Sequence, residues 1–202
     1  ACFNRIDFIQ PPVCTRCGTP LDLSLTGCEE CGRNPLVAID GIRSAAHFHD
    51  NPIRSAILQL KYQNHKAIAS TLAQILSSSY RKYEMTADVI VPVPLHKSRF
   101  KERGYNQCEL LARPLGEALG LPVNTHSLRR VKETKTQMTL AKTERHQNVR
   151  EAFECVDSDL AHSNILLIDD VCTTGSTLDS CATTLKASSV SAVWGLTLTR
   201  AQ

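Results

Sequence analysis

The 202-residue chain contains no apolar run long enough to cross a bilayer, and its amino terminus lacks the charged-then-apolar pattern of a secretion signal. It also lacks internal repeats, low-complexity tracts and a large excess of charge, since its formal net charge is only +3. A charge this small is not by itself evidence for nucleic-acid binding. With 42% hydrophobic and 21% charged residues, the composition excludes a disordered or membrane-inserted chain and predicts a soluble globular protein of the cytoplasm.

Cysteine, by contrast, is abundant, with nine residues in the chain. In a sequence without a secretion signal, cysteines are metal ligands or buried residues more often than disulfide partners. Four of them form two short pairs, Cys14-x-x-Cys17 and Cys28-x-x-Cys31, and a glycine follows each pair. Four thiolates in this arrangement suit tetrahedral Zn²⁺ in a closed structural site, so the pattern favours zinc over an iron–sulfur cluster or a redox-active pair.

The cysteine pairs predict a small first unit. Residues 1–36 are expected to form a zinc-ribbon-like segment, because about 35 residues cannot bury enough apolar surface to fold without a staple. Residues 37–202 are long enough for one α/β domain of ordinary size. The single cysteines that lie among apolar neighbours are expected to be small buried residues: Cys108, Cys155, Cys172 and Cys181.

From residue 36 onward, short apolar stretches alternate with helical patterns, which predicts an α/β fold with a parallel sheet flanked by helices. Strands are expected over 45–48, 89–93, 165–168 and 190–198. Helices are expected from Pro52 after an Asn51 cap, over 67–80, and over 107–119 with a kink or break at Pro114.

The most informative stretch is residues 165–178. Four branched apolar residues predict a strand buried on both faces, and Asp169 and Asp170 follow at its carboxyl end. A turn with hydroxyls and one glycine then precedes a helical pattern: Thr173, Thr174, Gly175, Ser176 and Thr177. A helix N-terminus offers unpaired amides to an anion, glycine permits close approach, and hydroxyls add donors. Because the acids suit sugar hydroxyls or Mg²⁺, the stretch predicts a sugar-phosphate site.

This stretch resembles the signature of the type I phosphoribosyltransferases, which bind phosphoribosyl pyrophosphate. The resemblance implies a phosphoribosyltransferase-like sheet, with Asp169 and Asp170 on the ribose hydroxyls and residues 173–177 around the 5′-phosphate. The alternative interpretation is an ordinary strand, turn and helix in which the acids form a solvated cap.

Two further loops are rich in basic residues. The loop over 94–107 follows a predicted strand and has four Lys or Arg within seven residues: Lys97, Arg99, Lys101 and Arg103. The loop over 126–150 has seven basic residues against two acidic ones and contains no Gly or Pro. Since α/β sheets bind ligands at the carboxyl ends of strands, the two loops indicate a ligand with more than one phosphate group, unless both are simply solvated.

Nearly the whole chain resembles the ComF/GntX-type phosphoribosyltransferase-like proteins associated with bacterial competence. Besides the cysteines and residues 165–178, the resemblance is carried by Leu60-Lys61-Tyr62, Val91-Pro92-Val93-Pro94-Leu95-His96, Arg103-Gly104-Tyr105-Asn106-Gln107 and Thr197-Leu198-Thr199-Arg200. It implies that 94–107 is a pyrophosphate loop and 129–150 a flexible loop. Arg99 and Arg103, with Lys135 or Arg145, are then expected to contact the pyrophosphate, and Mg²⁺ to accompany the ligand.

Three functions are compatible with these residues. The first is a phosphoribosyltransferase with an unidentified acceptor, linked to DNA uptake. The second is a non-catalytic protein that senses phosphoribosyl pyrophosphate as a signal. The third is a competence factor that grips single-stranded DNA and works with DNA-uptake proteins, although only Phe100 and Tyr105 supply aromatic rings within the two basic loops.

Overall fold

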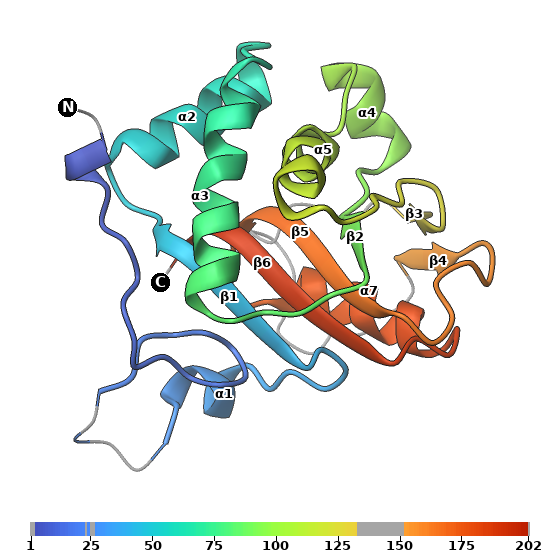
Figure 1. The fold of residues 1–202 in the computed structure, drawn as a ribbon, viewed down its shortest axis with the longest axis horizontal. Coiled ribbons are helices and arrows are strands. Elements are labelled where there is room, and N and C mark those ends of the chain that lie inside the picture. The colour runs from blue at the N-terminus through green and yellow to red at the C-terminus, as the bar shows by residue number, and fades with distance from the viewer. Residues whose placement is uncertain (1–2, 23, 25–26, 133–151, 202) are drawn as a thin grey trace.

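A four-stranded parallel sheet with the order β1-β6-β5-β2 organises the chain (Figure 1). It is seen in a computed structural model that describes residues 3–22, 24, 27–132 and 152–201. The strands of this sheet are β1 (Gly41–His47), β2 (Val89–Pro92), β5 (Asn164–Cys172) and β6 (Ala192–Arg200). A separate antiparallel pair is formed by β3 (Leu128–Arg130) and β4 (Phe153–Cys155).

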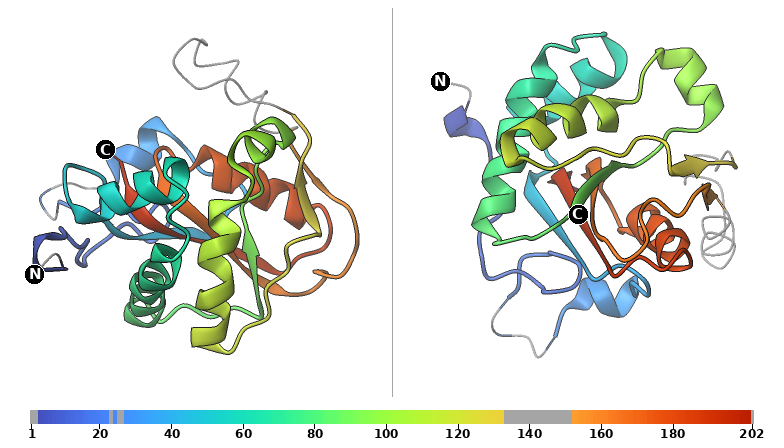
Figure 2. Two further views of the ribbon diagram at one scale, coloured as in Figure 1. Left: turned by 90° about the horizontal axis from the view of Figure 1, so that it is seen from above. Right: turned by 45° about the vertical axis from the view of Figure 1, so that its right-hand side comes forward.

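Helices cover both faces of the parallel sheet, as the two views of Figure 2 show. The helical elements are η1 (Phe3–Arg5), α1 (Glu29–Arg33), α2 (Pro52–Tyr62), α3 (Ile68–Lys82), α4 (Lys97–Arg103), α5 (Gln107–Leu119) and α7 (Ser176–Lys186). In Figure 1, α3 and α5 lie in front of the sheet and α7 lies behind it. The predicted α/β fold with a flanked parallel sheet is therefore confirmed. Among the described residues, no helix is long and apolar enough to cross a membrane.

Strand β5 is buried on both faces, as its apolar run predicts. Ile165 and Leu167 belong to the core that includes the apolar residues of α7. Leu166 and Ile168 belong to the core formed with α2, α3 and α5. Because successive strand residues point to opposite faces, one short run of sequence serves both cores.

The helix starts follow local capping chemistry. The Asn51 side chain accepts hydrogen bonds from the amides of Ile53 and Arg54, at 3.0 and 3.1 Å, so the predicted cap of α2 is confirmed. Helix α5 runs as one element through Pro114, so of the two predicted outcomes a break at this residue is wrong, and a kink there stays a prediction. The flanking Leu111 and Leu115 are fully buried, and this packing offsets the one backbone hydrogen bond that proline cannot make.

The predicted loop over 94–107 contains helix α4. The His96 side chain caps it by accepting from the Ser98 amide at 3.3 Å, and Gly104, with a φ of 79°, ends it. Because histidine is not among the usual N-cap residues, the sequence pattern does not predict this helix.

The amino-terminal segment packs against the sheet. The Ile42 amide of β1 donates to the carbonyl of Arg16 at 2.8 Å. Gly18 has a φ of 75°, and a Cβ there would lie 2.3 Å from the carbonyl oxygen of Ile42, so only glycine fits this approach. The division of the chain into units of residues 1–36 and 37–202 stays a prediction.

Asp179 on α7 binds the backbone of residues 37–39, the linker that follows the amino-terminal segment. Its Oδ1 atom accepts hydrogen bonds from the amides of Val37, Ala38 and Ile39 at 3.0, 2.8 and 3.0 Å. The linker is thereby attached to the helix that begins at the hydroxyl-rich turn.

Candidate functional site

The two acids of β5 have different neighbours. The Asp170 carboxylate meets Lys61 of α2, whereas the Asp169 carboxylate meets Cys108 at the start of α5. The two carboxylates therefore have different surroundings. The predicted role of both acids on one ribose remains a prediction.

Asp170 already has a partner. The Nζ atom of Lys61, near the end of α2, lies 2.8 Å from its Oδ2 atom, and the two side chains are 21% and 4% exposed. Burial disfavours the charged form of Lys61, but the Asp170 carboxylate outweighs this and raises the pKa of Lys61. The charge of Asp170 is thus balanced within the protein before any ligand arrives.

Asp169 lies in a different environment. Its Oδ1 atom accepts a hydrogen bond from the Asp170 amide at 2.8 Å and lies 3.3 Å from the Sγ atom of Cys108. Burial and the charge of Asp170 raise the pKa of Asp169 to about 7, although Lys61 opposes the rise. Burial also raises the pKa of the Cys108 thiol. Asp169 is therefore the acid that titrates near neutral pH.

The turn over 173–177 has the local geometry of an anion site. Gly175 has a φ of 83°, and a Cβ there would lie 2.8 Å from the Ile42 side chain, so both backbone and packing require glycine. The Thr174 hydroxyl lies 2.7 Å from the Ser176 hydroxyl and accepts from the Ser176 amide at 3.3 Å. The N-cap residue of the 11-residue helix α7, Gly175, supplies no side-chain cap, so first-turn amides beyond that of Ser176 can face an anion.

The predicted basic residues are distributed unequally. Arg99 lies half-exposed on α4 and pairs with Glu102 at 3.3 Å. Arg103 donates a hydrogen bond to Gln107, and its guanidinium lies 5.5 Å from the centre of the Tyr62 ring. Lys135 and Arg145 lie outside the described residues.

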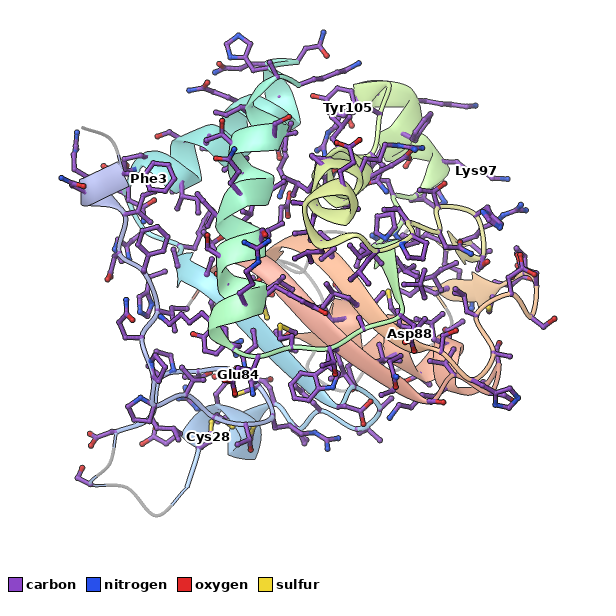
Figure 3. All side chains as sticks on the ribbon, in the orientation of Figure 1. Phe3, Cys28, Glu84, Asp88, Lys97 and Tyr105 are labelled. Carbon is purple, nitrogen blue, oxygen red and sulfur yellow. The ribbon has the colours of Figure 1, made fainter. Side chains whose placement is uncertain are left out.

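A cavity of about 470 Å³ lies between the end of α2 and α4. Its lining includes Lys61, Tyr62, Lys66, Glu102, Arg103 and Tyr105. Lys66 lies 4.6 Å from the centre of the Tyr105 ring, which Figure 3 labels near α4. Because Lys61 also pairs with Asp170, the cavity adjoins the acid, and the structure brings Arg103 to this place but not Arg99. Lys66 is a residue that sequence reasoning missed, since α2 and α4 are distant in the chain.

The four cysteines converge as predicted. Cys14 and Cys31 have Sγ atoms 3.7 Å apart, Cys17 and Cys28 have Sγ atoms 3.5 Å apart, and all four lie within 4.8 Å of one another. A tetrahedral zinc site with Zn–S bonds of about 2.3 Å requires sulfur separations of about 3.8 Å, which these distances fit. Figure 3 shows sulfur atoms gathered beside the labelled Cys28. The cluster is compatible with a structural metal such as zinc.

Arg200, at the end of β6, is a second residue whose position sequence reasoning missed. It is 2% exposed, its Nη1 atom donates to the Cys17 carbonyl at 2.7 Å, and the same atom lies 3.3 Å from the Sγ atom of Cys172. It borders a cavity of about 580 Å³ between the cysteine segment and the turn, together with Thr173 and Thr174. No sequence pattern distinguishes such a buried arginine from a solvated one.

The fold and the site define the class: an α/β protein with a four-stranded parallel sheet, a hydroxyl-rich turn after its acid-bearing strand and an amino-terminal four-cysteine cluster. The chain belongs to the family of Competence protein F, Competence protein ComFC and DNA utilization protein YhgH. It is 34% identical to Competence protein F of Haemophilus influenzae over 194 residues, which cover 92% of this chain and 84% of that protein.

Two further relatives have similar coverage. DNA utilization protein YhgH of Escherichia coli is 31% identical, with 94% of this chain and 85% of that protein covered. Competence protein ComFC of Bacillus subtilis is 32% identical, with 95% and 80% covered. No family model matches the chain.

Solved structures of phosphoribosyltransferases are more distant. The glutamine phosphoribosylpyrophosphate amidotransferase from B. subtilis has a TM-score of 0.45 and 19% identity, covering 65% of this chain and 26% of that chain. The purine phosphoribosyltransferase from Pyrococcus horikoshii has a TM-score of 0.39 and 16% identity, covering 65% and 81%. At these scores the likeness carries no argument about ligand or activity.

Proposed function

We propose that the chain binds phosphoribosyl pyrophosphate with Mg²⁺, in a site that supports displacement of the pyrophosphate. The observation that carries this proposal is the order of parts at the carboxyl end of β5. Two acids precede a turn with four hydroxyl residues and a left-handed glycine, and the helix that follows has no side-chain cap from its N-cap residue. A phosphate at the helix end and sugar hydroxyls at the acids use each of these groups.

Each group has a distinct role in this proposal. Residues 173–177 hold the 5′-phosphate, and Asp169 and Asp170 orient the ribose. Arg103 shares a cavity with Lys61, the partner of Asp170, and stabilises the leaving pyrophosphate together with Arg99 of α4. Lys135 or Arg145 adds a contact from the 129–150 loop. Mg²⁺, when bound, supplies further positive charge to the pyrophosphate oxygens. In transfer, the bond from the anomeric carbon to pyrophosphate breaks with its electron pair, and a nitrogen nucleophile forms the new bond.

Lys61 must change partner for this site to accept a ribose. Its ammonium occupies the Asp170 carboxylate, which is only 4% exposed. Because Lys61 also lines the cavity beside Arg103, the nearest anion available to it after release is the pyrophosphate of the bound ligand.

The test is calorimetric titration of phosphoribosyl pyrophosphate with Mg²⁺ into the full chain. Wild type should bind saturably, and the Asp169→Asn/Asp170→Asn variant should lose at least about tenfold in affinity. Asp50→Asn is the matched control, because the Asp50 side chain is 97% exposed and lies at the start of α2. Absence of binding by folded wild type would refute the proposal.

Zinc is the metal that we propose for the cysteine cluster, in a structural role. All four ligand positions are protein thiolates, so no position remains for a substrate. Elemental analysis of the purified chain should give one zinc per chain, and iron in its place would contradict the assignment.

A second candidate function is the handling of single-stranded DNA. The cavity between α2 and α4 favours it, because two lysines and Arg103 lie there beside the rings of Tyr62 and Tyr105. Single-stranded nucleic acid binds where cations interleave with stacking rings. The relatives named for competence and DNA utilization are consistent with a role in DNA uptake and with partners from that process.

This candidate is tested by fluorescence anisotropy with a labelled oligonucleotide at two salt concentrations. Tyr62, which is 68% exposed, is expected to contribute about 1–3 kcal/mol of stacking, so Tyr62→Ala should weaken binding markedly. Phe3→Ala removes a ring that is 50% exposed on η1, far from α4 in Figure 1, and is the control. Binding that is insensitive to salt or to Tyr62→Ala would argue against this function.

A further inference from the structure

Arg200 is a buried charge without a carboxylate partner among the described residues. Its Nη1 atom contacts a carbonyl and a thiol, and its Nη2 atom is buried and has no hydrogen-bond partner in the described part of the chain. An uncompensated buried guanidinium costs several kcal/mol, so a countercharge is expected nearby.

No ion pair joins Arg200 to the described acids that share its cavity. Asp22 accepts hydrogen bonds from the backbone and hydroxyl of Ser24. Glu29 pairs with Arg33 at 3.3 Å. The remaining acid, Glu30, accepts from the Asn34 side chain at 2.9 Å.

The four-cysteine cluster becomes a further source of negative charge when it holds a metal ion. A divalent ion held by four thiolates leaves an excess of two negative charges. Arg200 reaches the cluster through the Cys17 carbonyl, and a second cation, Arg43, reaches it through the Cys14 and Thr15 carbonyls at 3.4 and 3.0 Å. Two cations therefore face two excess negative charges.

Arg200 also reaches the turn. Its backbone lies between β1 and β5, paired with Cys172, and the Ala201 amide donates to the Cys172 carbonyl at 2.8 Å. Its side chain contacts the Cys172 thiol. Cys172 is the last residue of β5, so Thr173 and the rest of the turn continue directly from it.

We propose that Arg200 couples the four-cysteine cluster to the turn over 173–177. Its guanidinium balances the charge of the metal-loaded cluster and at the same time positions Cys172, from which the turn begins. Arg200 is thus a positioning residue that links metal occupancy to anion binding. The part that concerns the turn rests on the proposed function; the part that concerns the metal does not.

The first experiment measures equilibrium zinc affinity of the full chain by competition with a chelator of known affinity. Arg200→Met keeps the length of the side chain and removes its charge, so it should weaken zinc binding at least about tenfold. Arg113→Met is the control, because Arg113 pairs with Glu109 on the exposed face of α5. Unchanged zinc affinity in a folded Arg200→Met variant would overturn the proposal.

Arg200→Lys keeps the proposal testable if Arg200→Met fails to fold. Lysine retains the charge but has no second nitrogen in a fixed fork. The zinc affinity of Arg200→Lys should lie within about threefold of that of wild type, but ligand binding at the turn should no longer change it. Loss of zinc affinity as large as tenfold in folded Arg200→Lys would show that charge is not the cause and would contradict the proposal.

The second experiment repeats the zinc competition with saturating ribose 5-phosphate, which probes the turn without Mg²⁺. In wild type the sugar phosphate should raise zinc affinity at least about threefold, and zinc should raise sugar-phosphate affinity by the same factor. Arg200→Met and Arg200→Lys should show no such change. Binding of ribose 5-phosphate without any effect on zinc affinity would overturn the coupling.

The two proposals fail differently in this design. If zinc-loaded wild type binds neither ribose 5-phosphate nor phosphoribosyl pyrophosphate with Mg²⁺, the proposed function fails and the coupling to the turn fails with it. The comparison of Arg200→Met with Arg113→Met then still decides whether Arg200 supports the metal cluster.

Discussion

Asp169 and Asp170 are neighbours in the chain but occupy two different environments. On the α2 side, Asp170 is nearly inaccessible and its charge is balanced by Lys61. Beside α5, Asp169 contacts the Cys108 thiol and titrates near neutral pH. Two adjacent carboxylates thus differ in their surroundings: one pairs with a buried lysine, and the other titrates near neutral pH.

The largest effect on the free energy of unfolding is expected from breaking the ion pair between Lys61 and Asp170. Lys61→Met leaves the Asp170 carboxylate buried without its countercharge and should reduce the free energy of unfolding by about 2–3 kcal/mol at pH 7.5. Guanidinium unfolding measures this loss. Lys66→Met removes an exposed lysine of the same cavity that lies over the Tyr105 ring, and it should cost much less. Equal stabilities of the two variants would show that the Lys61 pair is screened by solvent.

Removing the titrating acid should have the opposite sign. The pKa of Asp169 is about 7 in the folded chain, against an ordinary value of 3.8. The folded state therefore binds the proton more tightly, so this group contributes stability below about pH 4 that is lost as the pH rises through 7. Asp169→Asn keeps an acceptor for the Asp170 amide and should be more stable than wild type by about 1–3 kcal/mol at pH 8.

At pH 4 the stability of Asp169→Asn and wild type should be nearly equal. At this pH the Asp169 carboxyl group is neutral in the folded chain and about half neutral in the unfolded chain. Thermal unfolding across this pH range checks the prediction. A variant that is less stable than wild type at pH 8 would mean that the Asp169 carboxylate is favoured in the fold.

The smallest effect is expected from altering the neighbour of Asp169. Cys108→Ser places a stronger donor beside its Oδ1 atom and stabilises the ionised carboxylate. The pH at which stability declines should fall by less than about one unit. Cys181 is buried in α7 and makes no hydrogen bond to Asp169 among the described residues, so Cys181→Ser should lower stability with a smaller effect on that pH.

The affinity for phosphoribosyl pyrophosphate should also depend on the protonation of Asp169. Ribose hydroxyls and Mg²⁺ favour an ionised carboxylate, so affinity should increase as the pH rises from 6 to 8 and Asp169 loses its proton. In Cys108→Ser the increase should occur at lower pH. Calorimetric titration at several pH values measures it, and an affinity that falls over this range would contradict a role for ionised Asp169.

The parts that were predictable are those whose residues lie close together in the chain. The two cysteine pairs and the run from β5 into α7 carry their own spacing, and the structure places them as expected. Helix α4 and the continuity of α5 through Pro114 were not foreseen, because an unusual cap and tertiary packing decide them.

The missed residues depend on distant elements. Lys66 joins the cavity through its contact with the Tyr105 ring. Arg200 reaches the cysteine segment and the turn through its contacts with Cys17 and Cys172. The pairing of Asp170 with Lys61 likewise joins two elements that are far apart in the chain. Burial and long-range contacts thus decide what single residues can do.

The hold of Asp179 on the linker has a consequence for proteolysis. Val37 is 64% exposed, so its side chain looks accessible to a protease, yet its amide and the next two amides are bound to one carboxylate. A protease needs this backbone extended and free, so cutting must wait until the linker detaches from α7. The rate of cleavage at residues 37–39 therefore reports how often the cysteine segment loosens from the rest of the chain.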